Sequence, residues 1–322
     1  MTTRPPAVVD LVEVGPRDGL QNEARTLDVD TRVELVRRLV ADGARRVEAV
    51  SFVRPARVPQ MAGAEEVMDG LRGLDASLIG LVLNRRGAER AAAASCDEVN
   101  VVVPVTDDFS VRNQGVPVDG MMEHAAAAVT VAREAGMGVS VTLAVAFGCP
   151  FSGIVTTAQV AAVVDRVADL GIDELAFADT VGVGVPPQVL DLAALVADDD
   201  RVPRLRFHFH NTRNTGYANA WAATTLDLSG HGGRVALDAS VGGFGGCPFA
   251  PAATGNIAME DLVHQLRRAG TPTAAPAPRV DALVGVAGWL AGQLDSPVQA
   301  LLGKAGDFPG DLPHDLIVGR QA

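Results

Sequence analysis

Short runs of β-branched and apolar residues alternate with longer runs of helical period along most of this chain. This alternation is typical of parallel strands that are joined by crossover helices. The runs that indicate strands lie at residues 8–14, 46–52, 77–83, 98–105, 138–147, 174–178, 205–210 and 235–240. Eight βα units are the number that closes a parallel barrel, so the sequence predicts an α/β fold built as a (βα)8 TIM barrel.

The end of the chain departs from this pattern. Residues 271–278 are rich in Pro, Ala and Thr, and residues 280–294 then show a helical pattern before a proline-punctuated end. We therefore expect residues 1–270 to form the barrel, and residues 271–322 to form a linker and a short C-terminal helical appendage packed on it. An open doubly wound sheet is the structural alternative, but the sequence has no G-x-G-x-x-G turn and no P-loop.

Charge and cysteine content restrict the partners and the compartment. The net charge of −12 is unfavourable for binding nucleic acid or an anionic membrane, so we expect neither as a partner, and an anionic substrate would need local attraction inside a cleft. Three cysteines are too few for a disulfide framework, and no apolar run reaches the about 20 residues of a membrane helix. These features favour the cytoplasm, with Cys96 and Cys149 interpreted as small buried apolar residues.

Reactive side chains collect where the predicted strands end. In a closed βα barrel these ends, and the loops that follow them, line one face where reactants can meet. The residues at such positions are Arg17, Asp18 and Gln21 after the first strand, Glu48 and Ser51 at the second, Asp179 and Thr180 at the sixth, His208 and His210 at the seventh, and Cys247 and Asn256 beyond the eighth. The sequence therefore predicts one functional site at this end of the barrel.

The two histidines of the seventh strand are the first candidates for metal ligands. His208 and His210 are two residues apart, and alternate side chains of a strand point to the same face. By itself such a pair suits a metal site and ordinary polar packing equally well. Together with Asp18 and Asn256 it forms a mixed oxygen and nitrogen set, which suits Mg²⁺, Mn²⁺ or Co²⁺ better than a closed thiolate zinc site.

Two further residues have side chains suited to catalysis. Cys247 lies in a loop dense in glycine, which would let its thiol approach a ligand closely. Arg17 is interpreted either as one half of a surface ion pair with Asp18 or as a group that polarises an oxygen of an anionic or thioester substrate.

Several ordered segments resemble the hydroxymethylglutaryl-CoA lyase family. They lie at residues 12–23, which include Gly15-Pro16-Arg17-Asp18-Gly19, and at residues 47–53, 58–61, 148–151, 179–184 and 243–250. The resemblance implies a TIM barrel in which a divalent cation, Mg²⁺ or Mn²⁺ with Co²⁺ or Zn²⁺ as alternatives, supports cleavage of an acyl-CoA thioester. The implied reaction converts 3-hydroxy-3-methylglutaryl-CoA to acetyl-CoA and acetoacetate.

The resemblance also implies a role for each matching residue. Asp18, His208, His210 and Asn256 match the metal ligands, and Arg17 matches the residue that stabilises the enolate oxygen. His208 and Cys247 match residues of proton transfer, while Glu48 and Asp179 match supporting acidic groups. We expect Gln21, Ser51 and Thr180, at the same strand ends, to contact the substrate.

The chain departs from the family pattern after the second histidine, where Asn211 replaces the usual Asp and Arg213 adds a cation. These changes could favour another acyl group, so citramalyl-CoA and isohexenylglutaryl-CoA are alternative substrates.

A metal-dependent barrel hydrolase and a catalytically silent binding protein are the alternatives from other classes. We interpret His231 as a solvated residue of an inserted loop, and the outer helices allow a homodimer.

Overall fold

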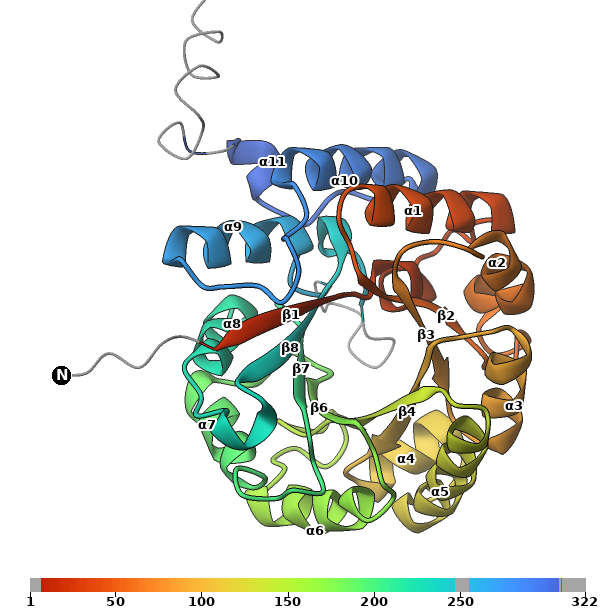
Figure 1. Ribbon diagram of the computed structural model, residues 1–322, viewed down its shortest axis with the longest axis vertical. Coiled ribbons are helices and arrows are strands. Elements are labelled where there is room, and N and C mark those ends of the chain that lie inside the picture. Colours follow the sequence, from red (N-terminus) through yellow and green to blue (C-terminus); the bar gives the residue numbers. More distant parts are fainter. Residues whose placement is uncertain (1–6, 247–254, 307, 309–322) are drawn as a thin grey trace, which may run out of the picture.

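The computed structural model describes residues 7–246, 255–306 and 308, and within them eight parallel strands close into a barrel. The strands follow one another in chain order, and β1 closes the barrel by pairing with β8 (Figure 1). Their bounds are β1 Val8–Glu13, β2 Arg46–Ser51, β3 Ser77–Val82, β4 Glu98–Pro104, β5 Gly138–Ala144, β6 Glu174–Asp179, β7 Leu205–Phe209 and β8 Arg234–Ala239. The predicted (βα)8 TIM barrel is confirmed.

Helices form an outer ring around the barrel (Figure 1). Their bounds are α1 Val29–Ala41, α2 Ala64–Gly70, α3 Arg85–Ala93, α4 Asp107–Gln114, α5 Val118–Glu134, α6 Thr157–Ala168, α7 Pro186–Ala194, α8 Gly216–Thr224, α9 Met259–Ala269, α10 Val280–Leu294 and α11 Leu302–Ala305. Local side chains fix several starts. Asp28 accepts a hydrogen bond from the Thr31 N–H at the start of α1, and Thr156 and Gln159 form a capping box at the start of α6.

The core lies on both sides of the sheet. Every residue of β2 and of β6 is buried, as expected for parallel strands covered by helices on one face and by barrel-filling side chains on the other. The appendage shares this core, because Leu283, Val286 and Leu290 of α10 are buried in it and α10 contacts α1 and α9. The division at residue 270 stays a prediction.

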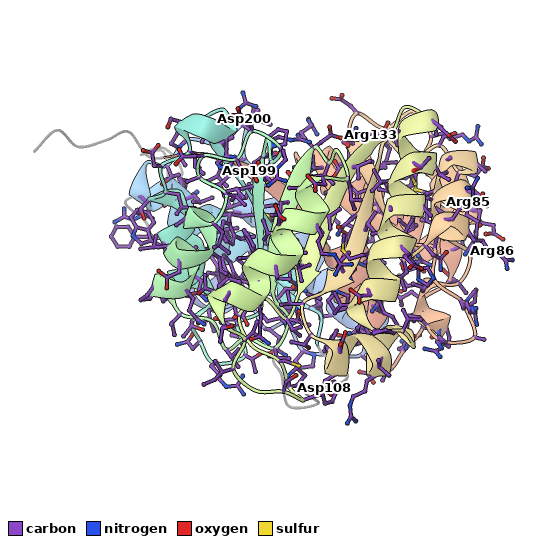
Figure 2. The ribbon with its side chains drawn as sticks, turned by 90° about the horizontal axis from the view of Figure 1, so that it is seen from below. Arg85, Arg86, Asp108, Arg133, Asp199 and Asp200 are labelled. Atoms are coloured by element: carbon purple, nitrogen blue, oxygen red, sulfur yellow. The ribbon has the colours of Figure 1, made fainter. Side chains whose placement is uncertain are left out.

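A buried ionic cluster fills the amino-terminal end of the barrel. Arg46 donates hydrogen bonds to Asp10, Glu98 and Glu174, at distances between 2.8 and 3.1 Å. Figure 2 shows the molecule from the side, with Asp108 of α4 towards one end and Arg133, Asp199 and Asp200 towards the other. Because α4 follows β4, Asp108 marks the carboxyl-terminal end, where the predicted site residues lie.

The loop before β8 is packed against the rest of the chain. His231 is only 2% exposed, and its Nδ1 lies 2.8 Å from the Val202 carbonyl oxygen, so the solvated interpretation was wrong. The loop folds back because Leu228 beside it is also buried in the core.

In the part of the chain that the structure describes, no helix has the length and apolar character to span a membrane.

Candidate active site

A single turn of π-helix after β1 places the first two site residues. Between Gly15 and Gly19 the chain forms a wide turn in which the N–H groups of Arg17, Asp18 and Gly19 all donate to the Val14 carbonyl oxygen, at 3.1, 2.7 and 3.2 Å. A Cβ on Gly15 would lie 2.6 Å from a carboxylate oxygen of Glu13, so this position requires glycine. The turn leaves Arg17 and Asp18 buried at the mouth of the barrel.

Both histidines of β7 face the same carboxylate. The Nε2 atoms of His208 and His210 lie 3.8 and 3.6 Å from Oδ2 of Asp18, and the ring centroids are 5.0 Å apart. One ligand atom from each of these three residues falls within 4.8 Å of the other two. The spacing of two residues on a strand therefore brings both imidazoles to one place, as the alternation of side chains predicts.

Asn256 joins this group through a short backbone pairing. An isolated bridge links it to His210, and its Nδ2 donates to Asp18 Oδ2 at 2.9 Å and to the Phe244 carbonyl oxygen at 3.1 Å. Its Oδ1 is buried and has no hydrogen-bond partner within the described residues. An amide oxygen in that position is costly unless a cation or a water satisfies it. The four predicted ligands thus converge, and their donor set fits a divalent ion.

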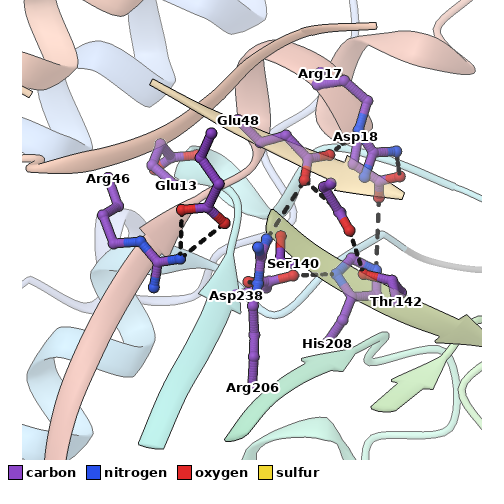
Figure 3. Close-up of polar contacts among 12 residues, drawn as sticks. Glu13, Arg17, Asp18, Arg46, Glu48, Ser140, Thr142, Arg206, His208 and Asp238 are labelled. Atoms are coloured by element: carbon purple, nitrogen blue, oxygen red, sulfur yellow. Dashed lines mark hydrogen bonds and ion pairs between the residues drawn. The ribbon is translucent and has the colours of Figure 1, made fainter. Parts of the chain in front are cut away.

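The group that orients the first histidine was not predicted from the sequence. Asp238, on β8, is buried, and its Oδ2 lies 3.1 Å from Nδ1 of His208, which leaves Nε2 towards Asp18. Arg206 donates from Nε to the other oxygen of Asp238 (Figure 3). The only sequence signal for Arg206 was its position two residues before His208 on the inward face of the same strand.

A second buried carboxylate holds the arginine of the site. Arg17 donates from Nε to Glu48 and from Nη1 to Asp18, and the Nη2 atom makes no hydrogen bond to another described residue. Glu48 in turn accepts a hydrogen bond from Asn100 Nδ2 at 2.8 Å, and Thr142 donates to Asn100 at 2.8 Å. Glu48 therefore lies beneath the site and orients the guanidinium, with one edge of Arg17 left for a ligand.

Electrostatics fix the charge state of these groups. Burial alone would raise the pKa of the Asp18 carboxyl, but the positive charge of Arg17 and the contact with His210 hold it well below its usual range. Burial lowers the pKa of the His208 imidazole, and the stronger combined effect of Asp238 and Asp18 raises it. The ionised carboxylate of Asp18 is the form that binds a cation, whereas an imidazole must be neutral to do so, so a bound cation would displace the proton that Asp238 and Asp18 favour on His208.

The remaining predicted residues divide into two groups. Gln21 and Thr180 line a cavity of about 1130 Å³ that also contains Arg17, Asp18 and both histidines. Ser51 is buried with its hydroxyl lacking a partner among the described residues, and it is not one of the residues that line this cavity. Cys247 lies outside the described residues.

Asp179 also lies apart from the cavity lining. Its two oxygens accept hydrogen bonds from the Val183 and Gly184 N–H groups, both at 2.9 Å, and burial raises the pKa of its carboxyl. In this arrangement Asp179 shapes the loop that follows β6. A direct part in catalysis stays a prediction for this residue.

The two departures from the family pattern face the backbone. Asn211 accepts a hydrogen bond from the Gly216 N–H at 3.2 Å. Arg213 donates to the Val181 and Gly182 carbonyl oxygens at 2.9 and 3.0 Å and is not among the cavity-lining residues. The expected extra cation of the pocket is thus a brace between the loops that follow β6 and β7.

Arginines gather instead at the rim of the cavity. Arg54, Arg57, Arg85 and Arg86 all line it and are exposed, and Arg85 and Arg86 extend into solvent from the start of α3 (Figure 2). No acidic residue lies in the first turn of that helix. Cations at a helix N-terminus oppose the helix dipole, so this rim is poised for an anion. Composition alone did not show this cluster, because its members are distant in the sequence.

The fold and the site define a class of protein, a (βα)8 barrel whose carboxyl-terminal end brings together a donor set that could hold a metal ion. Residues 8–283 match the HMGL-like family model. The chain is 42% identical to the (R)-citramalyl-CoA lyase of Chloroflexus aurantiacus over 92% of its own length and 95% of that protein. It is 41% identical to the hydroxymethylglutaryl-CoA lyase of Pseudomonas mevalonii, over 82% and 86% of the two chains.

Solved structures agree with these relatives. An HMG-CoA lyase from Acinetobacter baumannii, in complex with coenzyme A and 3-methylmalate, is 34% identical with a TM-score of 0.84 and covers 93% of this chain and 95% of its own. The hydroxymethylglutaryl-CoA lyase of Pseudomonas aeruginosa is 34% identical with a TM-score of 0.86, at coverages of 94% and 98%. The chain belongs to the HMGL-like family and is a carbon–carbon lyase.

Proposed function

We propose that this chain is a divalent-metal-dependent lyase that cleaves 3-hydroxy-3-methylglutaryl-CoA to acetyl-CoA and acetoacetate. The observation that carries the proposal is the meeting of His208, His210 and Asn256 on the carboxylate of Asp18, with the amide oxygen of Asn256 lacking a partner among the described residues. The guanidinium of Arg17 lies against the same carboxylate. Mg²⁺ and Mn²⁺ suit this donor set, and Co²⁺ and Zn²⁺ are the alternatives.

The residues divide the reaction between them. A bound divalent cation would lower the pKa of the tertiary hydroxyl of the substrate and hold it in place. With Nδ1 held by Asp238, the Nε2 of His208 faces the proposed ion site and would bind the cation, so the carboxylate of Asp18 beside it is the group suited to take the hydroxyl proton. As the carbon–carbon bond breaks, its electron pair moves onto the thioester, and Arg17 stabilises the enolate oxygen through its free edge. Cys247 would return a proton to the enolate carbon.

The rim of the cavity supports an acyl-CoA substrate. Coenzyme A carries several phosphate charges, and a chain of net charge −12 must attract them locally. Four exposed arginines lie at the rim. Arg85 donates to Glu89 at 2.8 Å, and Arg54, Arg57 and Arg86 supply that attraction. The cavity volume of about 1130 Å³ is also large enough for a long thioester chain.

A second candidate substrate is (R)-citramalyl-CoA. It is favoured by the 42% identity to a lyase of that name over nearly the whole of both chains. The same chemistry would then release acetyl-CoA and pyruvate, because the carboxylate is attached directly to the carbinol carbon. Isohexenylglutaryl-CoA, with a longer branch, is a third member of this substrate class.

Product analysis separates these substrates. Purified protein with Mn²⁺ is incubated with each thioester in turn, and acetyl-CoA and the released oxo acid are measured. The proposal predicts acetoacetate from 3-hydroxy-3-methylglutaryl-CoA at the highest kcat/KM. Pyruvate release from citramalyl-CoA at a much higher kcat/KM would assign the second substrate, and no acetyl-CoA from any of the three would refute the lyase proposal.

The cellular setting follows from the same reasoning. A reducing cytoplasm keeps the thiol of Cys247 available for proton transfer, and we propose the cytoplasm as the location. A homodimer is the proposed assembly, because outer helices of barrels commonly pair. Light scattering at micromolar concentration tests this assembly, and a mass of one chain would contradict it.

A further inference from the structure

Arg206 is the buried cation that connects the two halves of the site. Its side chain is fully buried on β7, on the same inward face as His208. Nε donates to Asp238 Oδ1, and Nη2 lies 3.4 Å from Oε2 of Glu48. Arg206 does not line the cavity, so any effect on a ligand must pass through these two carboxylates.

Each of the two carboxylates holds a side chain with a proposed chemical role (Figure 3). The second oxygen of Asp238 lies 3.1 Å from Nδ1 of the His208 imidazole. The second oxygen of Glu48 accepts a hydrogen bond from Nε of Arg17. The contacts therefore form one chain, in the order His208 imidazole, Asp238 carboxylate, Arg206 guanidinium, Glu48 carboxylate and Arg17 guanidinium.

The charges explain why a cation is needed at the centre. Asp238 and Glu48 are 4% and 0% exposed, and two such carboxylates near one another repel in a medium that water does not screen. The planar guanidinium compensates both and sets their separation, because its donors have fixed directions. A lysine ammonium would keep the charge without that fork.

We propose that Arg206 is a positioning residue, which fixes the imidazole of His208 and the guanidinium of Arg17 relative to one another. The turnover part of this inference rests on the proposed lyase function. The part that concerns the imidazole does not, because it predicts an effect on ion binding and on the tautomer of His208 whatever the substrate.

Arg46 provides a matched control for the loss of a buried arginine. It too is buried among carboxylates, Asp10, Glu98 and Glu174, but at the opposite end of the barrel. Arg46→Met and Arg206→Met should both lower the melting temperature. Only a positioning role predicts that the second variant also changes the site.

The experiment compares Arg206→Met, Arg206→Lys and Arg46→Met with the wild type. Mn²⁺ affinity is measured by electron paramagnetic resonance, the His208 tautomer by ¹⁵N-histidine NMR without metal, and turnover as separate kcat and KM values. For Arg206→Met we expect Mn²⁺ affinity to fall about 10- to 100-fold, kcat to fall with KM little changed, and the His208 nitrogen signals to move. Arg206→Lys should restore part of each loss, and Arg46→Met should leave Mn²⁺ affinity within about 3-fold of wild type.

Each outcome decides the proposal. Wild-type Mn²⁺ affinity and unchanged His208 signals in a folded Arg206→Met protein would overturn it, and so would an equal loss of affinity in Arg46→Met. If Arg206→Met does not fold, the same readouts on Arg206→Lys decide, because that variant keeps the buried charge. If the wild type cleaves no thioester but the metal and NMR effects are found, the positioning role stands and the proposed function falls.

Discussion

Glu13 is a buried carboxyl group whose protonation state affects the stability of the fold. The N–H groups of Gly15 and Val241 both donate to Oε1, at 2.7 and 3.0 Å, while Oε2 is buried without a partner among the described residues. Burial raises the pKa of this carboxyl to about 8. The protonated form is therefore the one that suits the folded state at neutral pH.

The raised pKa of Glu13 predicts how stability changes with pH. The folded state holds this proton more tightly than the unfolded chain, so its stabilising effect is full below about pH 4.5 and is lost as pH rises towards about 8. Glu13→Gln keeps an acceptor for both N–H groups and removes the titration. Between pH 5 and pH 8 we expect the wild type to lose roughly 3 to 4 kcal/mol more unfolding free energy than this variant, measured with urea. Parallel losses in the two proteins would contradict this assignment.

Arg17 should affect turnover much more than substrate binding. Its free guanidinium edge is proposed to stabilise the enolate oxygen, which exists only as the bond breaks. For Arg17→Met we expect kcat to fall about 10²- to 10³-fold, with KM changed much less. Steady-state kinetics check this, with the exposed Arg279→Met as the control. A rise in KM at unchanged kcat would show instead that Arg17 serves binding alone.

The sequence could predict the residues that approach the cavity and, through the family resemblance, Glu48 behind Arg17, but it did not predict Asp238 and Arg206 behind His208. His208, His210 and Asp18 are recognisable because their types and strand-end positions are unusual together. Asp238 is one acidic residue on an apolar strand, and only three-dimensional pairing places it behind His208. Predictions about exposure fail for the same reason, as His231 shows, because a polar residue in a glycine-rich loop can still be covered by another segment.

In the loop after β8, Gly245 packs directly against two of the proposed metal ligands, Asn256 and Asp18. At Gly245 the φ angle is +113°, and a Cβ there would lie 2.5 Å from Nδ2 of Asn256 and 3.2 Å from the Asp18 carbonyl oxygen. The absence of a side chain lets this loop pass between two of the proposed ligands.

Gly245→Ala should therefore damage the site more than the fold. The added methyl group would displace Asn256 and the turn that carries Asp18, so we expect Mn²⁺ affinity to fall at least about 10-fold. Gly136→Ala is the control, since Gly136 also has a positive φ, +73°, but a Cβ at this position would meet nothing within 4 Å. It should cost about 1 kcal/mol of stability and no metal affinity. Isothermal titration tests both, and equal affinities in the two variants would contradict this role of Gly245.

Strands were predictable as elements because their apolar runs are long and regular, and most predicted bounds lie within one residue of the observed ones. The fifth strand is the exception, since it was predicted over residues 138–147 and ends at Ala144. Val145 has a φ of +57°, an unusual conformation for a β-branched residue, and its N–H donates to the Thr180 hydroxyl at 2.9 Å. A tertiary contact thus ends a strand that the local sequence would continue.

At the scale of the whole molecule, the closed barrel concentrates arginine at one rim of an acidic protein. We expect these arginines to act on the nucleotide end of the substrate through charge. The double variant Arg54→Gln, Arg86→Gln should raise KM for the coenzyme A thioester about 5- to 10-fold at low salt, with kcat unchanged. The corresponding pantetheine thioester, which lacks the phosphates, should show no such change. An equal effect on both thioesters would contradict a role in binding phosphate.

Closure of the barrel was predictable from the count of βα units. The end of the barrel at which the cavity lies was predictable from the reactive side chains at the ends of the strands. The rim of arginines was not, because Arg54 lies in the loop after β2 and Arg86 at the start of α3, and the two reach one rim only when β2 pairs with β3. The identity of the substrate's acyl group is harder to predict from the sequence, because it depends on small differences in the volume of the side chains around the cavity.

The central claim is that one divalent ion, held by His208, His210, Asp18 and Asn256, supports the cleavage. The most direct test titrates Mn²⁺ into chelator-treated protein while acetyl-CoA release is followed. We predict no turnover without metal, full turnover at one ion per chain, and loss of both ion binding and turnover in His210→Ala. Turnover that persists at the full rate in metal-free protein would contradict the claim.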